Sequence, residues 1–266
     1  MVEVKGLEFS EWDSFVDESE QGTIFSKTDW FKLFDIPFRL YGVYRNNNLI
    51  GGSGCFNTCA PITQFQGVLI APQTSKYVNQ LSINNEVSTA LIPYLPDEFA
   101  CHYTFEDVRP FLWNGYQASV RYTYIVKPDW DNLEKDTRNE IKRANINVEL
   151  SDDIELFDSL YDYTFSHKGL KRTASSELIF KVFNNPFTEL WMASDKSAGA
   201  MLIKDSKRYY YILGASLSTG TSSKVLWEAI KDKKEVDLVG CNNFKINTFK
   251  KGFGGHLEPY YNVKRI

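Results

Sequence analysis

Apolar and polar residues alternate in short runs through the first half of the chain, which predicts strands joined by polar turns. A hairpin is predicted from residues 39–45 and 49–56, because three asparagines at 46–48 separate two runs of strand character. Between later runs, a stretch of helical character predicts a helix at about 82–95. Further strands are predicted at 65–70, 98–105 and 118–126.

The second half repeats this order of elements. A helix is predicted at about 222–233, where Val225, Leu226, Ala229 and Ile230 recur at spacings of three and four. Strands are predicted, in order along the chain, at 188–194, 197–203, 208–214, 235–239 and 256–265.

The two halves match element by element at an offset of roughly 137 to 150 residues, within the error of predicted boundaries. Each half also begins with helical material, at 12–34 and at 132–184. A hairpin, a strand, a helix and two final strands indicate an α/β (α+β) chain with mixed, mostly antiparallel sheets. We therefore expect two domains, residues 1–127 and 128–266, each with a sheet flanked by helices. The alternative is a loose match of the kind any α/β chain makes with itself.

Composition fits this expectation and narrows the protein class. The chain of 266 residues is long enough for two domains, and its 43% hydrophobic and 15% aromatic content supplies their cores. No apolar run approaches the ~20 residues of a membrane helix. The N-terminus lacks a basic start followed by an apolar stretch, so no secretory signal is expected. We expect a cytoplasmic protein without integral membrane association.

Cysteine and histidine give no sign of a metal site. The four cysteines, at 55, 59, 101 and 241, are few for this length, so we expect buried or half-buried free thiols. The CxxxC spacing of the first two lacks a second pair of ligands. The three histidines are isolated and have neither metal-ligand nor triad spacing. No metal cofactor is therefore expected.

Charge is unevenly distributed along the chain, although the net charge is only −4. Residues 1–125 hold 8 Lys and Arg against 14 Asp and Glu, a balance of −6. Residues 200–266 hold 12 against 6, a balance of +6. The basic last quarter is suited to an anionic group. Solvated surface lysines would give the same imbalance without a ligand.

The most specific pattern lies between residues 225 and 261. "WEAI" at 227–230 on the predicted helix is followed by "DLVG" at 237–240 on a strand and by "FKKGFGG" at 249–255, which we expect to be a loop. In this order and spacing the pattern resembles the Fem-type peptidoglycan aminoacyltransferases, members of the GNAT superfamily. Phe25-Ser26 with Trp30, and "TRNEIKRA" at 137–144, resemble further motifs of the family. The resemblance covers nearly the whole chain.

Fem-type proteins contain two tandem GNAT-like domains, so the resemblance implies this fold for both halves. Family members that build interpeptide bridges often carry a long coiled-coil arm in the second domain. Residues 145–189 provide only ~45 residues without sustained heptads, so this chain is more similar to the smaller GNAT-like relatives. The acceptor stays open among peptidoglycan precursors, amino sugars, lipid-linked amines and small peptides.

A donor site is predicted in the segment "GASLSTGTSSK" at 214–224, which connects a strand to a helix. Small residues allow close approach of the backbone, and N–H groups at a helix start carry positive partial charge. In GNAT proteins this position binds the pyrophosphate of coenzyme A. The full coenzyme A pattern is absent here, so the donor could be acyl-CoA (acetyl-CoA) or aminoacyl-tRNA. An ordinary Ser-capped helix is the alternative. The residues proposed for donor binding are Ser218, Gly220, Thr221, Ser222, Ser223 and Lys224.

Lys250 and Phe249 form the matched "FK" pair. The resemblance implies that Lys250 contacts substrate or donor phosphate, with Phe249 packing beside it. A surface lysine beside a flexible turn is the alternative. Asp237 lies between Val236 and Leu238 on a strand, so alternation places its side chain on the opposite face, where it need not be buried. Asp237 could orient the amine or cap the neighbouring loop.

Other side chains are candidates for catalysis or substrate binding. Tyr209 and Tyr211 share a face of their strand, and a phenol at a GNAT sheet split is a plausible general acid. Core packing is the alternative for both. His167 is a candidate base on the substrate side, and Trp30, Phe249 and Arg172 are candidate substrate contacts. Basic residues could also follow a nucleic-acid or polyphosphate backbone, with a solvated helix face as the alternative: Lys135, Arg138, Lys142, Lys168, Lys171 and Arg172.

These features predict an N-acyltransferase that transfers an acyl or aminoacyl group from acyl-CoA or aminoacyl-tRNA to an amine acceptor. Lys250, Asp237, Tyr211 and Tyr209 are its candidate catalytic residues. The alternative is a GNAT-fold module that binds a peptide, sugar or nucleotide without catalysis. The incomplete coenzyme A pattern and the lack of an obvious catalytic carboxylate favour that alternative. The oligomeric state stays open.

Overall fold

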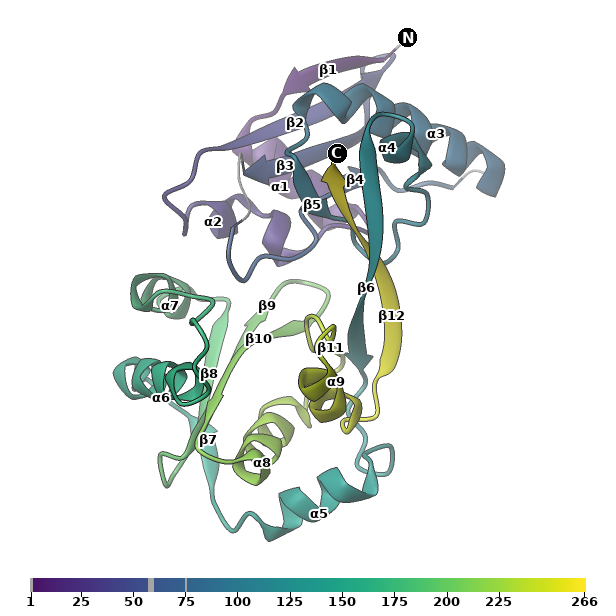
Figure 1. The fold of residues 1–266 in the computed structure, drawn as a ribbon. Coiled ribbons are helices and arrows are strands. Elements are labelled where there is room, and N and C mark those ends of the chain that lie inside the picture. The colour runs from purple at the N-terminus through teal and green to yellow at the C-terminus, as the bar shows by residue number, and fades with distance from the viewer. Residues whose placement is uncertain (1, 57–59, 75) are drawn as a thin grey trace. The chain divides into compact units, whose positions relative to one another are not determined.

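The computed structural model describes residues 2–56, 60–74 and 76–266, and it divides the chain into two compact units. The first unit comprises Met1–Arg121 and Pro259–Ile266, and the second comprises Tyr122–Glu258. Strands β6 (Tyr116–Val126) and β12 (His256–Arg265) each begin in one unit and end in the other (Figure 1). Cys59 lies outside the described residues.

The first unit contains a four-stranded antiparallel sheet in the order β1-β2-β3-β4. A further strand, β5 (Glu98–Ala100), pairs with the end of β12 at Asn262, Val263 and Lys264. The sheet strands are β1 (Glu3–Gly6), β2 (Phe38–Arg45), β3 (Asn48–Phe56) and β4 (Val68–Ile70). The helices are α1 (Phe9–Glu18), η1 (Ile24–Ser26), α2 (Thr28–Phe31), α3 (Tyr77–Leu91), η2 (Ile92–Tyr94) and α4 (Arg109–Leu112).

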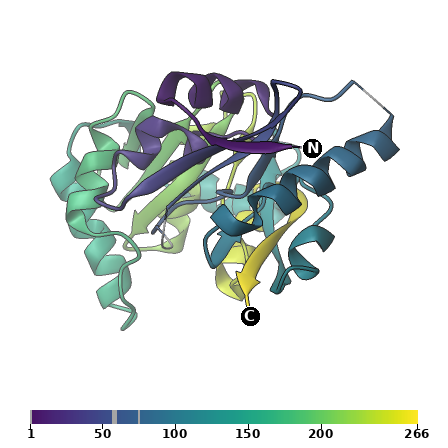
Figure 2. The same ribbon diagram turned by 90° about the horizontal axis from the view of Figure 1, so that it is seen from above.

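Glycines in β3 let two helices pack directly on the sheet. A Cβ at Gly51 would lie 2.5 Å from Val87 of α3, and a Cβ at Gly54 would lie 2.7 Å from the ring of Trp12 of α1. Residues 51 and 54 face opposite sides of a strand. The sheet therefore lies between α1 and α3 (Figure 2).

The second unit has a sheet in which neighbouring strands run β6-β11-β10-β9-β8-β7. The pairing is antiparallel except between β10 and β11, which are parallel. Its strands are β7 (Val148–Leu150), β8 (Thr188–Ala193), β9 (Ala198–Lys204), β10 (Tyr209–Ser216) and β11 (Val236–Asp237). Its helices are α5 (Lys135–Arg143), α6 (Ile154–Ser166), α7 (Ser176–Phe183), α8 (Thr219–Ile230) and α9 (Phe244–Lys251).

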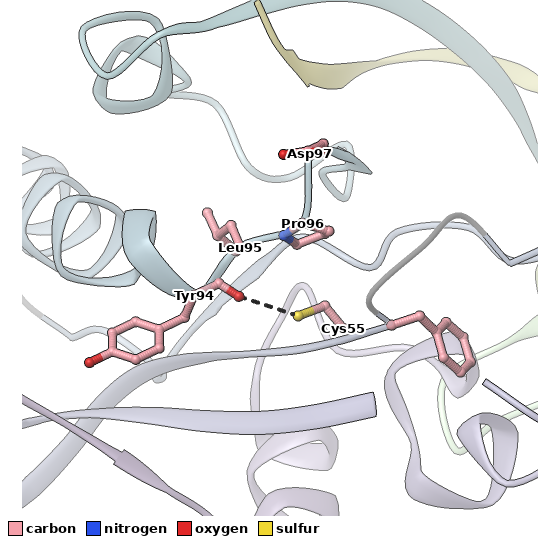
Figure 3. Close-up of a pocket in the computed structure, with 6 residues that line it drawn as sticks. Cys55, Tyr94, Leu95, Pro96 and Asp97 are labelled. Carbon is pink, nitrogen blue, oxygen red and sulfur yellow. Dashed lines mark hydrogen bonds between the residues drawn. The ribbon is translucent and has the colours of Figure 1, made fainter. Parts of the chain in front are cut away.

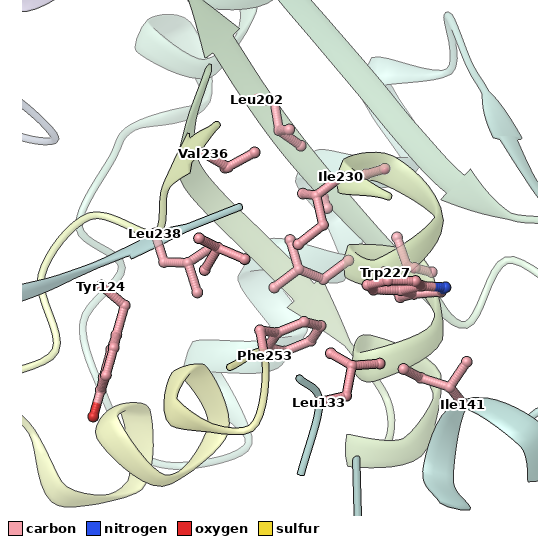
Figure 4. Packing of buried hydrophobic residues seen from close by; sticks show 14 of the residues in the cluster. Tyr124, Leu133, Ile141, Leu202, Trp227, Ile230, Val236, Leu238 and Phe253 are labelled. Carbon is pink, nitrogen blue, oxygen red and sulfur yellow. The ribbon is translucent and has the colours of Figure 1, made fainter. Parts of the chain in front are cut away.

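Helices cover both faces of this second sheet. Ala200 and Leu202 of β9 pack against α8 in one hydrophobic cluster, which also holds Leu238 and Phe253 (Figure 4). A Cβ at Gly199, on the opposite face, would lie 2.8 Å from Phe157 of α6. Burial on both faces explains why β9 is apolar almost throughout.

The predicted fold class is confirmed. Both halves contain a hairpin, a strand, a helix and two further strands, as β2-β3-β4-α3-β5-β6 and β8-β9-β10-α8-β11-β12. The sheets are mixed α/β in character, mostly antiparallel and flanked by helices. The compact units differ from the two predicted domains in two segments, because Pro259–Ile266 belongs to the first unit and residues 122–127 belong to the second.

Two predicted strands are shorter than expected, because a side chain accepts backbone N–H groups and turns the chain. The strand predicted at 98–105 ends at Ala100, and Nδ1 of His102 accepts the N–H of Thr104 just beyond it. The strand predicted at 235–239 ends at Asp237, whose carboxylate accepts the N–H of Val239. Such local bonds compete with the sheet ladder.

Other predicted bounds also differ from the structure. The strand predicted at 65–70 begins at Val68, and the helix predicted at 222–233 runs from Thr219 to Ile230. The helix predicted at 82–95 runs from Tyr77 to Leu91, and Pro93 lies in the 3-10 turn that follows it. The "FKKGFGG" segment is not simply a loop, because its first three residues form the last turn of α9. Asn243 caps that helix by accepting the N–H of Lys245, a signal of helix initiation that the glycines downstream obscured.

Candidate active site

Strands β10 and β11 separate inside the second sheet. They pair only at Tyr209↔Val236 and Tyr210↔Asp237, whereas β10 continues to Ser216. Beyond Tyr210 the described pairing of β10 is with β9 alone, and a register shift between Tyr211 and Leu213 marks a bulge there. This strand split leaves one edge of β10 unpaired within the sheet.

Lys250 belongs to α9, and its ammonium lies just beyond the end of β11, beside the strand split. Its ammonium is buried, with the side chain only 8% exposed, and donates hydrogen bonds to three consecutive carbonyl oxygens. These belong to Leu238, to Val239 at 2.5 Å and to Gly240 at 2.8 Å. An ammonium has three N–H donors, so all of them are used within the protein. Contact with a donor phosphate, the role expected for Lys250, would require breaking these bonds.

Asp237 is fully buried beneath this turn, not on a free strand face. One carboxylate oxygen accepts the hydroxyl of Thr123 at 2.5 Å and the N–H of Val239 at 2.7 Å. The other oxygen is buried without a hydrogen-bond partner among the described residues. Burial raises the pKa of Asp237, and the hydrogen bonds from Thr123 and Val239 and the charges of Arg208 and Lys250 oppose this rise.

Burial also shifts the pKa of Lys250, lowering it to about 8, while the charge of Asp237 opposes the shift. The ammonium lies 5.7 Å from the ring centroid of Tyr211. Lys250, Asp237 and Tyr211, three of the predicted catalytic residues, are therefore gathered at the strand split.

The ring of Tyr211 lies beside the ammonium of Lys250, and its hydroxyl, which lies over Gly214, has no hydrogen-bond partner among the described residues. Burial raises the pKa of its phenol, which therefore stays protonated at neutral pH. The hydroxyl sits over Gly214, where a Cβ would lie 1.8 Å from it. A glycine at 214 is thus required for this position of the ring, a requirement that sequence reasoning did not foresee.

Tyr209 packs against the same core cluster as Tyr211 but in a different local environment. The ammonium of Lys233 lies 4.2 Å from its ring centroid and 2.7 Å from a carboxylate oxygen of Glu189. Tyr209 therefore belongs to a charged cluster near the start of β10, away from the bulge.

The predicted donor segment lies at the start of α8, directly after β10. Among the described side chains, none caps the helix N-terminus: the hydroxyls of Ser218 and Thr221 bond each other at 2.7 Å, and Ser222 donates to Ser216 at 2.5 Å. Nothing lies within 4 Å of a Cβ placed on Gly220. The backbone at the helix start is thus accessible next to a cluster of hydroxyls.

Two members of the predicted donor set bond to other parts of the protein. Ser223 is buried and donates to Glu140 of α5 at 2.6 Å. Lys224 pairs with Glu228, four residues along α8, at 2.6 Å. A cation near a helix N-terminus is unfavourable for the helix dipole, and Glu228 provides the anionic partner that offsets it.

The remaining candidates are spread over other elements. Phe249 packs in the core cluster against Phe253 at 5.3 Å. Trp30 is fully buried in the first unit, where its indole N–H donates to Thr63 at 3.0 Å. This burial leaves no ring surface for a ligand.

Arg172 and His167 lie around the C-terminal end of α6. The guanidinium of Arg172 pairs with Asp158 and donates to the carbonyl of Ala174 at 2.8 Å, so it ties α6 to the segment before α7. His167 is exposed and stacks on Tyr163 at 5.3 Å. Neither residue contacts Lys250, Asp237 or Tyr211, the three residues gathered at the strand split.

Elsewhere, a pocket of about 230 Å³ lies in the first unit (Figure 3). It lies between the end of β3 and the segment before β5, and the Sγ of Cys55 donates to the carbonyl of Tyr94 there at 3.7 Å. Burial raises the pKa of the Cys55 thiol to about 11, so this thiol is not a ready nucleophile. The residues proposed above for catalysis or donor binding do not line this pocket.

The described residues contain no cluster of three or more His, Cys, Asp or Glu side chains that could hold a metal ion. Cys55, Cys101 and Cys241 are buried free thiols, as predicted. Within the same residues, no helix is both long enough and apolar enough to span a bilayer.

No protein-family model matches the sequence, and neither does any curated protein. Solved structures do match. The chain is similar to FemX with a TM-score of 0.67 and 14% identity, over 97% of this chain and 96% of that one. It is similar to the C-terminal domain of a putative lysylphosphatidylglycerol synthetase from Agrobacterium fabrum with a TM-score of 0.58 and 12% identity, over 97% and 91%.

A putative acetyltransferase from Pyrococcus horikoshii gives a TM-score of 0.55 and 10% identity, over 98% of this chain and 88% of that one. At such low identities the similarity establishes the fold. The resemblance to Fem-type, GNAT-like proteins expected from the sequence is confirmed at that level.

Proposed function

We propose that the protein is an N-acyltransferase that carries an acyl or aminoacyl group from acyl-CoA or aminoacyl-tRNA to an amine. The observation that carries the proposal is the strand split between β10 and β11, at which Tyr211, Asp237 and Lys250 gather. The fold shared with FemX and with a putative acetyltransferase supports it. The proposed acceptor is an amine, which is a peptidoglycan precursor, an amino sugar or another amine.

The unpaired edge of β10 suits an extended donor. A strand edge presents N–H and C=O groups that can pair with a chain laid beside it. The edge runs from Tyr211 to Ser216 and ends at the start of α8. A donor whose arm follows this edge would bring its phosphate to the helix N-terminus.

The donor contacts at α8 can be narrowed within the predicted set. Ser223 and Lys224 are held by Glu140 and Glu228, so we assign the phosphate contacts to the backbone and hydroxyls at Ser218, Gly220, Thr221 and Ser222. The open space over Gly220 permits the backbone to approach a ligand closely.

The reaction itself needs no external co-reactant. The amine nitrogen attacks the acyl carbonyl carbon, a C–N bond forms, and the C–S bond of a thioester or the C–O bond of an aminoacyl ester breaks. The amine loses one proton and the leaving group gains one. We assign Tyr211 as the acid, because its phenol stays protonated and its ring lies beside Lys250 at the strand split.

Calorimetric titration tests the donor half of this proposal. Acetyl-CoA and a charged tRNA are titrated separately into the full chain, and one of them is expected to bind with a Kd below ~1 mM, about −4 kcal/mol. Tyr211→Phe should leave that affinity unchanged, because the phenol acts on the reacting bond. If neither donor binds, the enzyme proposal fails and the non-catalytic binding module takes its place.

A further inference from the structure

The backbone at the end of β11 is held in an unusual conformation. Val239 and Gly240 are consecutive residues with positive φ, 53° and 63°. A left-handed conformation is unfavourable for a β-branched residue such as valine, so the surroundings must hold it in place. Leu238, anchored in the hydrophobic core, precedes this turn (Figure 4). The three hydrogen bonds from Lys250 follow from this turn, because it aims successive carbonyls at one point.

The N–H groups of the same turn must point away from Lys250. In a trans peptide the C=O of one residue and the N–H of the next are antiparallel. The N–H of Val239 donates to Asp237 at 2.7 Å, and the N–H of Cys241 donates to the carbonyl of Tyr122 at 2.8 Å. The N–H of Gly240, between them, has no partner among the described residues.

The surroundings of Gly240 leave room for a ligand. Nothing lies within 4 Å of a Cβ placed on this glycine, and the residue is partly exposed. A backbone N–H that has no hydrogen-bond partner beside a buried ammonium is unusual in a folded protein, because most backbone N–H groups are hydrogen-bonded.

Lys250 increases the donor strength of this N–H. Its ammonium binds the carbonyl oxygen of Val239, which belongs to the same peptide group as the N–H of Gly240. A charged hydrogen bond to a carbonyl draws electron density from the peptide nitrogen, so the opposite N–H becomes a better donor. A fixed, polarised N–H is the kind of group that stabilises a developing oxyanion.

We infer that the N–H of Gly240 binds the acyl carbonyl oxygen of the donor as it becomes an oxyanion, and that Lys250 is the positioning residue that orients and polarises this N–H. The inference rests on the proposed acyl-transfer function. It gives Lys250 a role through the Val239–Gly240 peptide in place of a direct phosphate contact. Thioesters and aminoacyl esters share this carbonyl, so the inference applies to either donor.

The first test observes the Gly240 amide directly in protein labelled with ¹⁵N-glycine. Two pairs of probes are titrated: S-acetonyl-CoA against CoA, and the stable 3′-alanylamino analogue of adenosine against adenosine. Within one pair, the member with the carbonyl is expected to move the Gly240 proton downfield by about 0.3 ppm or more, and the member without it is not. The pair that responds identifies the donor class.

Three results would overturn some part of the account, each in a different way. If the Gly214 or Gly220 amide shifts with a probe but Gly240 does not, the donor binds and the oxyanion inference is wrong. Equal Gly240 shifts with both members of a pair would also refute it. If no glycine responds to any probe, the proposed function fails together with the inference.

The second test addresses Lys250 without any ligand. The charge on Lys250 is lost as the pH rises through its lowered pKa of about 8, and the Gly240 proton of the wild-type chain should move upfield with it. Asp237, Cys241 and Tyr211 are the other titratable groups near the ammonium, and they are followed in the same spectra. Lys250→Met should abolish this titration, and the matched neighbour Lys251→Met should retain it.

Activity gives a third readout once a donor is known. Lys250→Met is expected to lower kcat on the order of 10²-fold with little change in KM for the donor. A rise in KM at constant kcat would instead show that Lys250 contributes to donor binding, as a phosphate contact would. If the chemical shift of the Gly240 amide proton in the wild-type chain does not change with pH, Lys250 does not polarise this N–H. This result is decisive even if the methionine variant fails to fold.

Discussion

At the scale of single residues, the lysine of the "FK" motif shows how one side chain can be prominent in sequence and still be hidden in the fold. A lysine next to glycines is usually a surface group, because a charged amine is costly to bury. Here three backbone carbonyls accept its donors, and the neighbouring carboxylate of Asp237 offsets part of the cost. The residue therefore stabilises a turn first, and any catalytic effect passes through that turn.

Removing this ammonium should be costly for stability. Lys250→Met leaves three buried or half-buried carbonyl oxygens without a donor, at roughly 1–3 kcal/mol for each group that water cannot reach, so the free energy of unfolding should fall by about 3 kcal/mol. Lys251→Met removes an exposed pair with Glu134, which solvent screens, so the free energy of unfolding should hardly change. Urea unfolding measures the free energy of unfolding of both variants. Equal decreases would contradict the three hydrogen bonds from Lys250 to backbone carbonyls.

Asp237 gives a pH-dependent prediction. Its folded-state pKa lies above the unfolded value, so its contribution to stability is present at pH below 3.8 and is lost as the pH rises through the folded pKa. Asn at this position cannot ionise. The stability of Asp237→Asn relative to wild type should therefore increase between pH 4 and pH 7, as measured by urea unfolding. A stability difference between Asp237→Asn and wild type that stays constant over this range would contradict the raised pKa of Asp237.

At the scale of elements, strands and the helix after β10 could be predicted because their apolar spacing is set by local packing. β2, β3, β8, β9, β10 and β12 all lie within a residue or two of their predicted bounds. β11 and α9 could not, because their bounds depend on hydrogen bonds made by Asp237 and Asn243 to the backbone nearby. The turn whose carbonyls bind Lys250 lies between these two elements, so the least predictable part of the fold carries the candidate site.

Replacing two glycines near the strand split by alanine should change the stability of the protein in opposite directions. Gly214→Ala places a Cβ 1.8 Å from the hydroxyl of Tyr211, so the ring must move, stability should fall by about 1–3 kcal/mol, and transfer should be lost. Gly220→Ala meets nothing within 4 Å and lies in α8, so stability should rise by up to about 0.5 kcal/mol. If the donor phosphate approaches the backbone at 220, its affinity should fall in that variant.

Thermal unfolding and calorimetric titration of the two glycine variants check these expectations. A destabilised Gly220→Ala would contradict the open space over that residue. If Gly214→Ala is fully active, the position of the Tyr211 ring is not needed for transfer.

At the scale of the whole molecule, the chain crosses between its two units within β6 and within β12. The sequence repeat predicted the order of elements in each half, because each repeat has its own hydrophobic pattern. The partner of the last strand could not be predicted, because strand pairing depends on contacts between distant residues. β5, for instance, pairs with residues 262–264, more than 160 positions along the chain.

The last eight residues should therefore be essential to the first unit. Val263 is fully buried in its core cluster, and Tyr260 is buried too. Ending the chain at Glu258 removes both side chains and the partner of β5, at a cost of about 3–5 kcal/mol or more. Hydrogen exchange should show reduced protection in β2 and β3 and retained protection in β9. Full protection of β2 and β3 in the truncated chain would contradict this role.

The central claim, acyl transfer at the strand split of the second unit, is tested most directly by trapping the acyl group with hydroxylamine. The full chain is mixed with acetyl-CoA or with charged tRNA in excess hydroxylamine, and hydroxamate is quantified by mass spectrometry. Wild type should form hydroxamate from one donor well above the uncatalysed rate. Tyr211→Phe should reduce it about 10²-fold, while Tyr44→Phe in the first unit should not. Hydroxamate at the uncatalysed rate with both donors, or equal rates for wild type and Tyr211→Phe, would contradict the account.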